Sequence, residues 1–153
     1  MFAVFVKDFY VGASGYQVQL VDAAGRIVAS ATARNRSFKK TGLVDLAVTS
    51  ITSTKAYYLD GDSEIRYLTA TGKTGTAYRI TLTGDQLASF SVTPDDRPIA
   101  VTVIDYASQP PRMRLFTDDL AGGHQVELFS SSTVGTWQVK ASTSSTRRPR
   151  TGC

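Results

Sequence analysis

The sequence holds a single cysteine and a single histidine, and this scarcity excludes several kinds of chemistry. Cys153 has no partner for an intramolecular disulfide, and together with His124 it is too little for a zinc ligand set. His124 follows two glycines in a predicted turn, where an exposed side chain is a better interpretation than a catalytic or metal-binding one. We therefore predict no catalytic residue, no metal site and no cofactor.

Long apolar runs are missing as well. No run approaches the roughly 18 apolar residues that a membrane-spanning helix needs, so no membrane span is predicted. The apolar start at residues 2–6 lacks a basic beginning and continues into Lys7 and Asp8, which is unlike a signal sequence. No segment shows a convincing helical period either, so the expected fold class is all-β.

Short strands with alternating apolar and polar residues recur at a nearly constant interval. Similar segments begin at Gln17, Glu64 and Met113, which are 47 and 49 residues apart, and residues 2–9 align without a gap on residues 99–106. A period in the forties built only of strands is typical of a β-propeller blade. The predicted strands of two complete blades are 46–51, 55–59, 64–68 and 76–82, then 89–93, 99–105, 112–117 and 125–129.

The number of blades is too small for a closed ring. Known propellers have about four to eight blades. The sequence, by contrast, predicts a partial β-propeller of two complete four-stranded antiparallel blades flanked by incomplete ones. Residues 134–139 supply only the first strand of a further blade. We therefore expect a fragment of a larger propeller, whose partners are the remaining blades of a parent chain, with self-association as the alternative. Val4 and Val6 are expected to lie on an uncovered face.

An aspartate closes the second strand of each unit, at Asp8, Asp60 and Asp105. A short carboxylate at a strand end can accept hydrogen bonds from the backbone N–H groups of the following turn. We interpret all three as structural turn residues rather than catalytic ones.

One acidic cluster offers a metal-binding alternative. Asp60, Asp62 and Glu64 have the spacing of the first three ligands of an EF-hand calcium loop. Ile65, however, occupies the place of the required glycine, and Thr71 stands where the bidentate glutamate belongs. A β-turn with solvated acids is the better interpretation, and a calcium site remains the minor one.

The last residues differ in composition from the rest. Residues 1–140 carry the repeat, whereas residues 141–153 have no alternation and are predicted to be a disordered basic tail. The net charge of +4 depends on this tail, because without its three arginines 14 basic residues face 13 acidic ones. The remaining basic residues are interleaved with acids, so no nucleic-acid partner is predicted.

A family resemblance rests on the turn Thr93-Pro94-Asp95-Asp96 and the strand that follows it. It resembles the Ser-Pro-Asp-Gly turn of TolB-like, WD40-like propeller repeats, with Thr93 standing for the serine and Asp96 for the glycine. Residues 57–62 are similar to the same repeats, although the middle unit lacks the Pro-Asp pair.

The resemblance implies a bacterial, extracytoplasmic-type propeller that acts as a non-catalytic scaffold and binds a protein or peptide on its face. The wider group includes the gating propellers of serine peptidases. The alternative is therefore an accessory domain of a hydrolase whose catalytic domain lies outside this chain.

Overall fold

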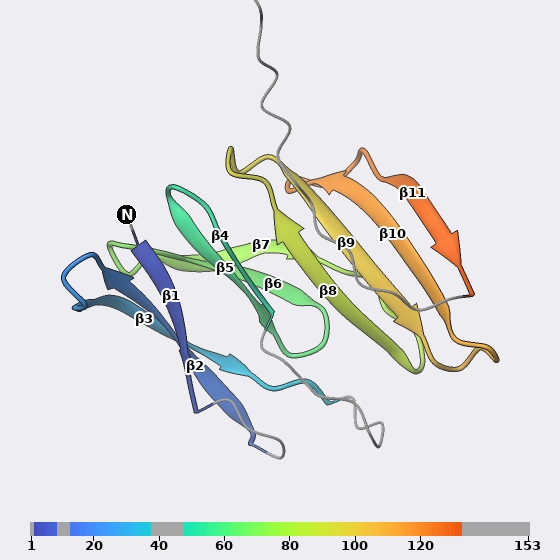
Figure 1. Cartoon of the computed structure of the whole chain (residues 1–153), viewed down its shortest axis with the longest axis horizontal. Coiled ribbons are helices and arrows are strands. Elements are labelled where there is room, and N and C mark those ends of the chain that lie inside the picture. The colour runs from blue at the N-terminus through green and yellow to red at the C-terminus, as the bar shows by residue number, and fades with distance from the viewer. Residues whose placement is uncertain (1, 9–12, 38–47, 133–153) are drawn as a thin grey trace, which may run out of the picture.

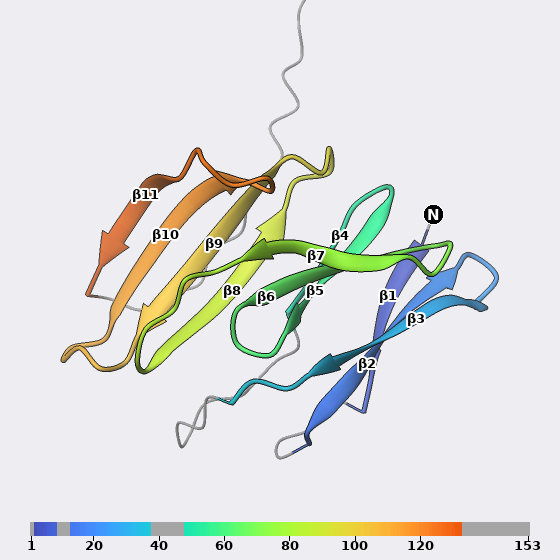
Figure 2. The same ribbon diagram turned by 180° about the vertical axis from the view of Figure 1, so that it is seen from behind.

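The computed structural model describes residues 2–8, 13–37 and 48–132, and these form only strands, turns and extended segments (Figure 1). Three antiparallel sheets follow one another along the chain and lie side by side as three layers (Figures 1 and 2). The all-β prediction is confirmed. None of the described residues belongs to a helix of the length and apolarity needed to cross a membrane.

Each sheet is a meander in which strands that are consecutive in the chain are hydrogen-bonded neighbours. The first sheet contains β1 (Phe2–Lys7), β2 (Gly15–Asp22) and β3 (Ile27–Arg34). The second contains β4 (Thr49–Ile51), β5 (Lys55–Asp60), β6 (Glu64–Thr69) and β7 (Thr74–Arg79). The third contains β8 (Gln86–Val92), β9 (Pro98–Asp105), β10 (Arg112–Asp119) and β11 (Val126–Ser131).

The second and third sheets match the eight predicted strands, with differences at the ends. The fourth strand of the second sheet ends at Arg79 rather than residue 82, because its partner strand β6 begins at Glu64, the residue that pairs with Arg79. Residues 134–139, the predicted boundary at residue 140 and the predicted tail lie outside the described residues.

The turns between strands contain residues with left-handed backbone geometry. Gly61, between β5 and β6, has a φ of 68°, which glycine adopts without a steric cost. Asp96, between β8 and β9, has a φ of 58°. Aspartate is among the few non-glycine residues that tolerate this region, so Asp96 fits the position that the resemblance assigns to a glycine.

The second sheet is buried on both faces, and β5 shows this directly. Successive side chains of a strand point to opposite faces, and the five residues from Ala56 to Asp60 are all buried. Tyr58 packs toward the first sheet, whereas Tyr57 packs toward the third. We call the contact between the first and second sheets the first seam, and the contact between the second and third sheets the second seam.

Each seam has its own apolar cluster. The buried cluster of the first seam is Tyr16, Val18, Leu20, Ala29, Ala33, Ala56, Tyr58 and Leu68. That of the second seam is Tyr57, Leu59, Ile65, Ile80, Ala88, Phe90, Val92, Ile99, Val101, Val103 and Phe116.

The prediction that Val4 and Val6 lie on an uncovered face is wrong. Both are partly buried and pack against the cluster of the first seam. Phe5, which the alternation of side chains along β1 places on the opposite face, is 54% exposed.

Candidate functional site

The carboxylate of Asp60, the last residue of β5, forms hydrogen bonds across the first seam. Its Oδ1 accepts hydrogen bonds from the backbone N–H of Arg34 at 2.7 Å and from Nε of the same residue at 3.0 Å. The N–H of Gly61 donates in return to the Arg34 carbonyl at 2.9 Å. The end of β3 is thereby joined to the end of β5.

The electrostatics of this contact favour the ionised carboxylate. Burial raises the pKa of Asp60, but the hydrogen bonds and charge of Arg34 and the charge of Arg66 outweigh it, so the pKa lies below its ordinary value. Arg66 Nη1 is 3.7 Å from Asp60 Oδ2. Asp60 is therefore an anion that links two sheets.

The three strand-closing aspartates have different environments. Asp105 Oδ1 accepts the N–H of Ala107 at 2.9 Å, which is the turn contact that the sequence predicts. Asp60 differs from the prediction, since the structure places its carboxylate against Arg34 of the neighbouring sheet and not against its own turn. Asp8 directly follows β1 with a φ of 61°, and its next residues, 9–12, lie outside the described residues.

The acidic cluster considered for calcium does not converge on one point. Asp62 accepts hydrogen bonds from the backbone N–H and the hydroxyl of Ser37. Glu64 accepts the hydroxyl of Thr76 at 2.6 Å and lies 3.8 Å from Arg79. Within residues 2–8, 13–37 and 48–132, no group of three or more His, Cys, Asp or Glu side chains is placed to hold a metal ion.

Asp96, in the turn between β8 and β9, forms hydrogen bonds across the second seam. Its carboxylate accepts the phenol hydroxyl of Tyr57 at 3.0 Å and the hydroxyl of Thr54, and Lys55 Nζ is 3.4 Å away. Burial and the bond to Asp96 raise the pKa of Tyr57 well above its ordinary value. The phenol therefore stays protonated and acts as a donor across the seam.

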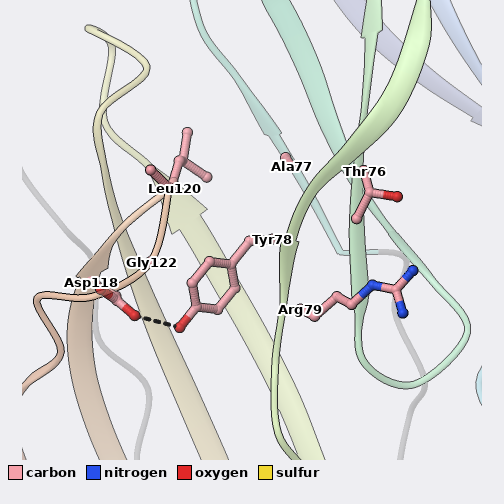
Figure 3. A pocket seen from close by; sticks show the side chains of 8 residues that line it. Thr76, Ala77, Tyr78, Arg79, Asp118, Leu120 and Gly122 are labelled. Carbon is pink, nitrogen blue, oxygen red and sulfur yellow. Dashed lines mark hydrogen bonds between the residues drawn. The ribbon is translucent and has the colours of Figure 1, made fainter.

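A second tyrosine–aspartate pair lies further out on the same seam, where β7 faces β10. Tyr78 donates its hydroxyl to Asp118 Oδ2 at 2.7 Å, while Asp118 Oδ1 accepts the N–H groups of Asp119 at 2.8 Å and His124 at 2.9 Å. Burial, followed by the bond to Asp118, raises the pKa of Tyr78 to about 12. Figure 3 shows the Tyr78 ring pointing from β7 to Asp118.

A groove of about 390 Å³ opens at this pair, and we call it the β7–β10 groove. The residues that line it are Thr76, Ala77, Tyr78, Arg79, Asp118, Leu120, Ala121 and Gly122. One wall is thus a continuous stretch of β7, and the other is the end of β10 with the turn that follows it. In Figure 3 Leu120 lies on the same side as the Tyr78 ring, whereas Arg79 points away from it.

His124 lies beside the groove on the turn before β11. Its side chain is 80% exposed, as the sequence predicts, and its Nδ1 is 2.8 Å from Asp119 Oδ2.

Sequence reasoning missed the residues that join the sheets, namely Arg34, Tyr57, Tyr78, Asp96 and Asp118. The contacts between them span 26 to 40 positions in the chain. The repeat gave no signal for them, because Tyr57 and Tyr78 lie on different strands of one sheet, and Asp96 lies in a turn whereas Asp118 lies in β10.

The fold and the site together define an all-β protein of three stacked antiparallel meanders, with an open polar groove along one edge. No family model, characterised protein or solved structure matches this chain.

Proposed function

We propose that this protein is a non-catalytic scaffold of propeller-type blades that binds a protein or peptide segment, and that the segment lies in the β7–β10 groove. The observation that carries the proposal is that an edge strand forms one wall of the groove. β7 is the last strand of its sheet, with no strand partner on its outer side in the described part of the chain.

An edge strand offers unpaired backbone N–H and C=O groups, and an extended peptide can add to it as a further strand. The backbone then supplies hydrogen bonds, while pockets beside the strand read alternate side chains of the peptide. Tyr78 and Leu120 provide apolar surface for such side chains, and Asp118 provides a buried anion. The groove is therefore suited to an extended polypeptide.

The proposal of a non-catalytic role is supported by the state of the carboxylates. The pKa is lowered for each described aspartate whose value departs from the ordinary one, and the residues are Asp22, Asp60, Asp95, Asp96, Asp105 and Asp118. A general acid needs a raised pKa near the working pH. These groups are instead held ionised by structural hydrogen bonds.

The proposal of propeller-type blades is supported by the contact between β4 and β8, the first strands of the second and third sheets. The N–H of Val92 donates to Ser50 Oγ at 3.0 Å, so these two strands meet directly. In a propeller, the first strands of neighbouring blades surround the central channel. The order of strands in each sheet then runs from the channel outward.

Panning of a displayed library of short linear peptides against the purified chain tests the proposed function. We expect selected peptides to lose at least about tenfold in affinity, roughly 1.4 kcal/mol, for the variant Ala121→Arg, whose long side chain fills the groove. The matched control Ala24→Arg lies in the exposed turn between β2 and β3 and should bind them unchanged. Selection of no peptide, or equal binding to both variants, would contradict the proposal.

Hydrogen exchange of the bound complex identifies the mode of binding. Strand addition predicts slower exchange at backbone amides of β7 when a selected peptide is present. Protection confined to other strands would place the peptide elsewhere and overturn the assignment of the groove.

A further inference from the structure

Among the described residues that line the β7–β10 groove, Asp118 is the one whose charged group faces the interior. It is 7% exposed and lies near the end of β10. Its carboxylate meets the hydroxyl of Tyr78, whose ring points to it from β7 (Figure 3). Arg79 also lines the groove, but its side chain points away from that ring and is 76% exposed. The interior of the groove is therefore anionic.

Asp118 keeps the capacity to bind a further donor. A carboxylate offers about four acceptor sites. Oδ1 accepts the N–H groups of Asp119 and His124, whereas Oδ2 accepts a single hydrogen bond within the described part of the chain, from Tyr78. All three donors are uncharged, so none of them neutralises the carboxylate. Burial raises the pKa of Asp118, but these hydrogen bonds outweigh it and hold the pKa below its ordinary value.

Apolar atoms line the groove beside this anion. The ring of Tyr78 forms one wall, and Leu120 lies on the same side as the ring (Figure 3). Ala77 and Ala121 add small side chains to the lining. Lysine and arginine combine a long apolar stem with a charged head, and they bury the stem along apolar surface. The face of an aromatic ring also attracts a cation. The lining is therefore suited to both parts of a basic side chain.

The backbone of β7 determines which side chains of an added peptide face the groove. The N–H of Ile80, directly after β7, donates to the Ser63 carbonyl at 2.9 Å, so the backbone groups of Ile80 face β6. Hydrogen-bonded and non-hydrogen-bonded pairs alternate along an antiparallel ladder, so the backbone groups of Arg79 face the outer edge. A peptide residue that pairs with Arg79 lies opposite it, and its two neighbours place their side chains on the face of Tyr78.

We propose that the peptide bound in the β7–β10 groove carries a lysine or arginine, whose stem packs along Tyr78 and Leu120 and whose cationic head binds Asp118. This proposal rests on the proposed function, because it concerns the same groove. Charge complementarity carries it, since a buried anion with uncharged donors gains a charged one. An acidic side chain at that position would instead place two like charges close together, which is unfavourable.

Panning of the displayed library of short linear peptides against the full chain supplies the probes. We expect the selected peptides to be enriched in lysine and arginine relative to the unselected library. The same library panned against Asp118→Asn should show no such enrichment, because this variant lacks the charge but keeps an acceptor for the N–H groups of Asp119 and His124. Absence of enrichment on the wild type, or equal enrichment on both proteins, would overturn the proposal.

A binding cycle then measures the contact itself. The basic residue of a selected peptide is replaced by glutamine, and both peptides are titrated by calorimetry against the wild type and Asp118→Asn. The replacement should weaken binding to the wild type by about tenfold or more. It should have little effect on binding to Asp118→Asn, because the partner of the cation is already absent. Effects that simply add would show that the basic side chain does not contact Asp118.

Asp119→Asn is the matched control, since it removes a carboxylate from the adjacent position of the chain. Side chains alternate along β10, so Asp119 lies on the other face, where its Oδ2 is 2.8 Å from His124 Nδ1. This variant should bind the basic peptide as tightly as the wild type does. A loss equal to that of Asp118→Asn would assign the effect to the net charge of the surface and would overturn the assignment to Asp118.

Two results separate this proposal from the proposed function. Peptides that lose affinity for Ala121→Arg but keep it when their basic residue is replaced leave the groove assignment standing and overturn the proposed cation contact. A library that yields no binder overturns both proposals. Far-ultraviolet CD checks that each variant folds. If Asp118→Asn does not fold, the glutamine-substituted peptide decides on the wild-type chain, because that change leaves the protein intact.

Discussion

In the first seam a carboxylate faces a guanidinium group, whereas in the second seam the carboxylates face phenol hydroxyls. Asp60 binds Arg34, whose side chain is 67% exposed, while Asp96 and Asp118 accept hydrogen bonds from Tyr57 and Tyr78. Each contact joins a strand of one sheet to a turn or strand end of the next. The contacts of Asp60 therefore rest on an ion pair, whereas those of Asp96 and Asp118 include neutral phenol donors, and Lys55 adds a charge beside Asp96.

The difference has physical consequences. An exposed cation is screened by salt, so the attraction across the first seam weakens as ionic strength rises. A phenol hydroxyl has no charge to screen, but it is lost as a donor when the phenol ionises. The contact of Asp60 with Arg34 should therefore respond to acid and salt, and that of Tyr78 with Asp118 to acid and alkali.

The largest effect is expected from the apolar clusters, which have similar chemistry in both seams. Leu68 and Ile65 are both fully buried on β6, in the first and second seams respectively. Leu68→Ala and Ile65→Ala should each lower the free energy of unfolding by about 2–5 kcal/mol, because each leaves a cavity. Urea denaturation measures the loss. A loss below about 1 kcal/mol for either variant would show that its seam is not packed as described.

A smaller effect is expected from the ion pair. Asp60→Asn keeps an acceptor for the backbone N–H of Arg34 but removes the charge, and it should cost about 1–2 kcal/mol. The cost should shrink in high salt. Asp22→Asn is the matched control, because Asp22 pairs with Arg26 in an exposed turn, and its stability should match that of the wild type. Equal losses for the two variants would mean that Asp60 does not join the sheets.

The phenol contact on the outer part of the second seam should contribute about the same or slightly less. Tyr78→Phe removes one donor to Asp118, which keeps the N–H groups of Asp119 and His124, and it should cost about 1 kcal/mol. Added salt should leave this loss unchanged. A strong salt dependence would show that charge, and not the hydroxyl, carries the contact.

The smallest but most selective effect is on the pH dependence of stability. The pKa of Asp60 is lowered in the folded protein. Its contribution to the free energy of unfolding is therefore present above about pH 3.8 and is lost as the pH falls through the pKa of the folded state. The pKa of Tyr78 is raised from 10.0 to about 12, so its contribution is present below pH 10 and is lost as the pH rises toward 12.

Melting temperatures across the pH range separate these contributions. Asp60→Asn should make the acid limb less steep and leave the alkaline limb as it is. Tyr78→Phe should make the alkaline limb less steep, with the remaining slope due in part to Tyr57. If both variants changed the two limbs equally, the seams would not differ in the way described.

The sequence was sufficient for the strands but not for the contacts between sheets. Alternation of side chains is a local property, and it placed the predicted strand at residues 99–105 within one residue of β9 (Pro98–Asp105). It also placed Asp60 at a strand end. The partner of Asp60 could not be predicted, because Arg34 is 26 positions away and reaches it only when two sheets stack.

The same limit applies to the groove. Tyr78 and Asp118 are separated by 40 positions; Tyr78 lies within a predicted strand, whereas Asp118 lies one residue beyond the strand predicted at 112–117. The repeat interval of the strands alone does not show which faces of neighbouring sheets meet, or which positions along the strands lie opposite one another. The prediction for Val4 and Val6 was wrong for this reason, since the sequence did not show which face of β1 packs against the second sheet.

Hydrogen exchange of the free protein tests the central claim, that the first and third sheets cover the two faces of the second sheet. β5 is buried on both faces, whereas nearly all residues of the outer strand β11 are exposed. Backbone amides of β5 should therefore exchange only through global unfolding, with those of β11 exchanging much faster through local opening. Exchange of β5 as fast as that of β11 would contradict the stacked arrangement of the three sheets.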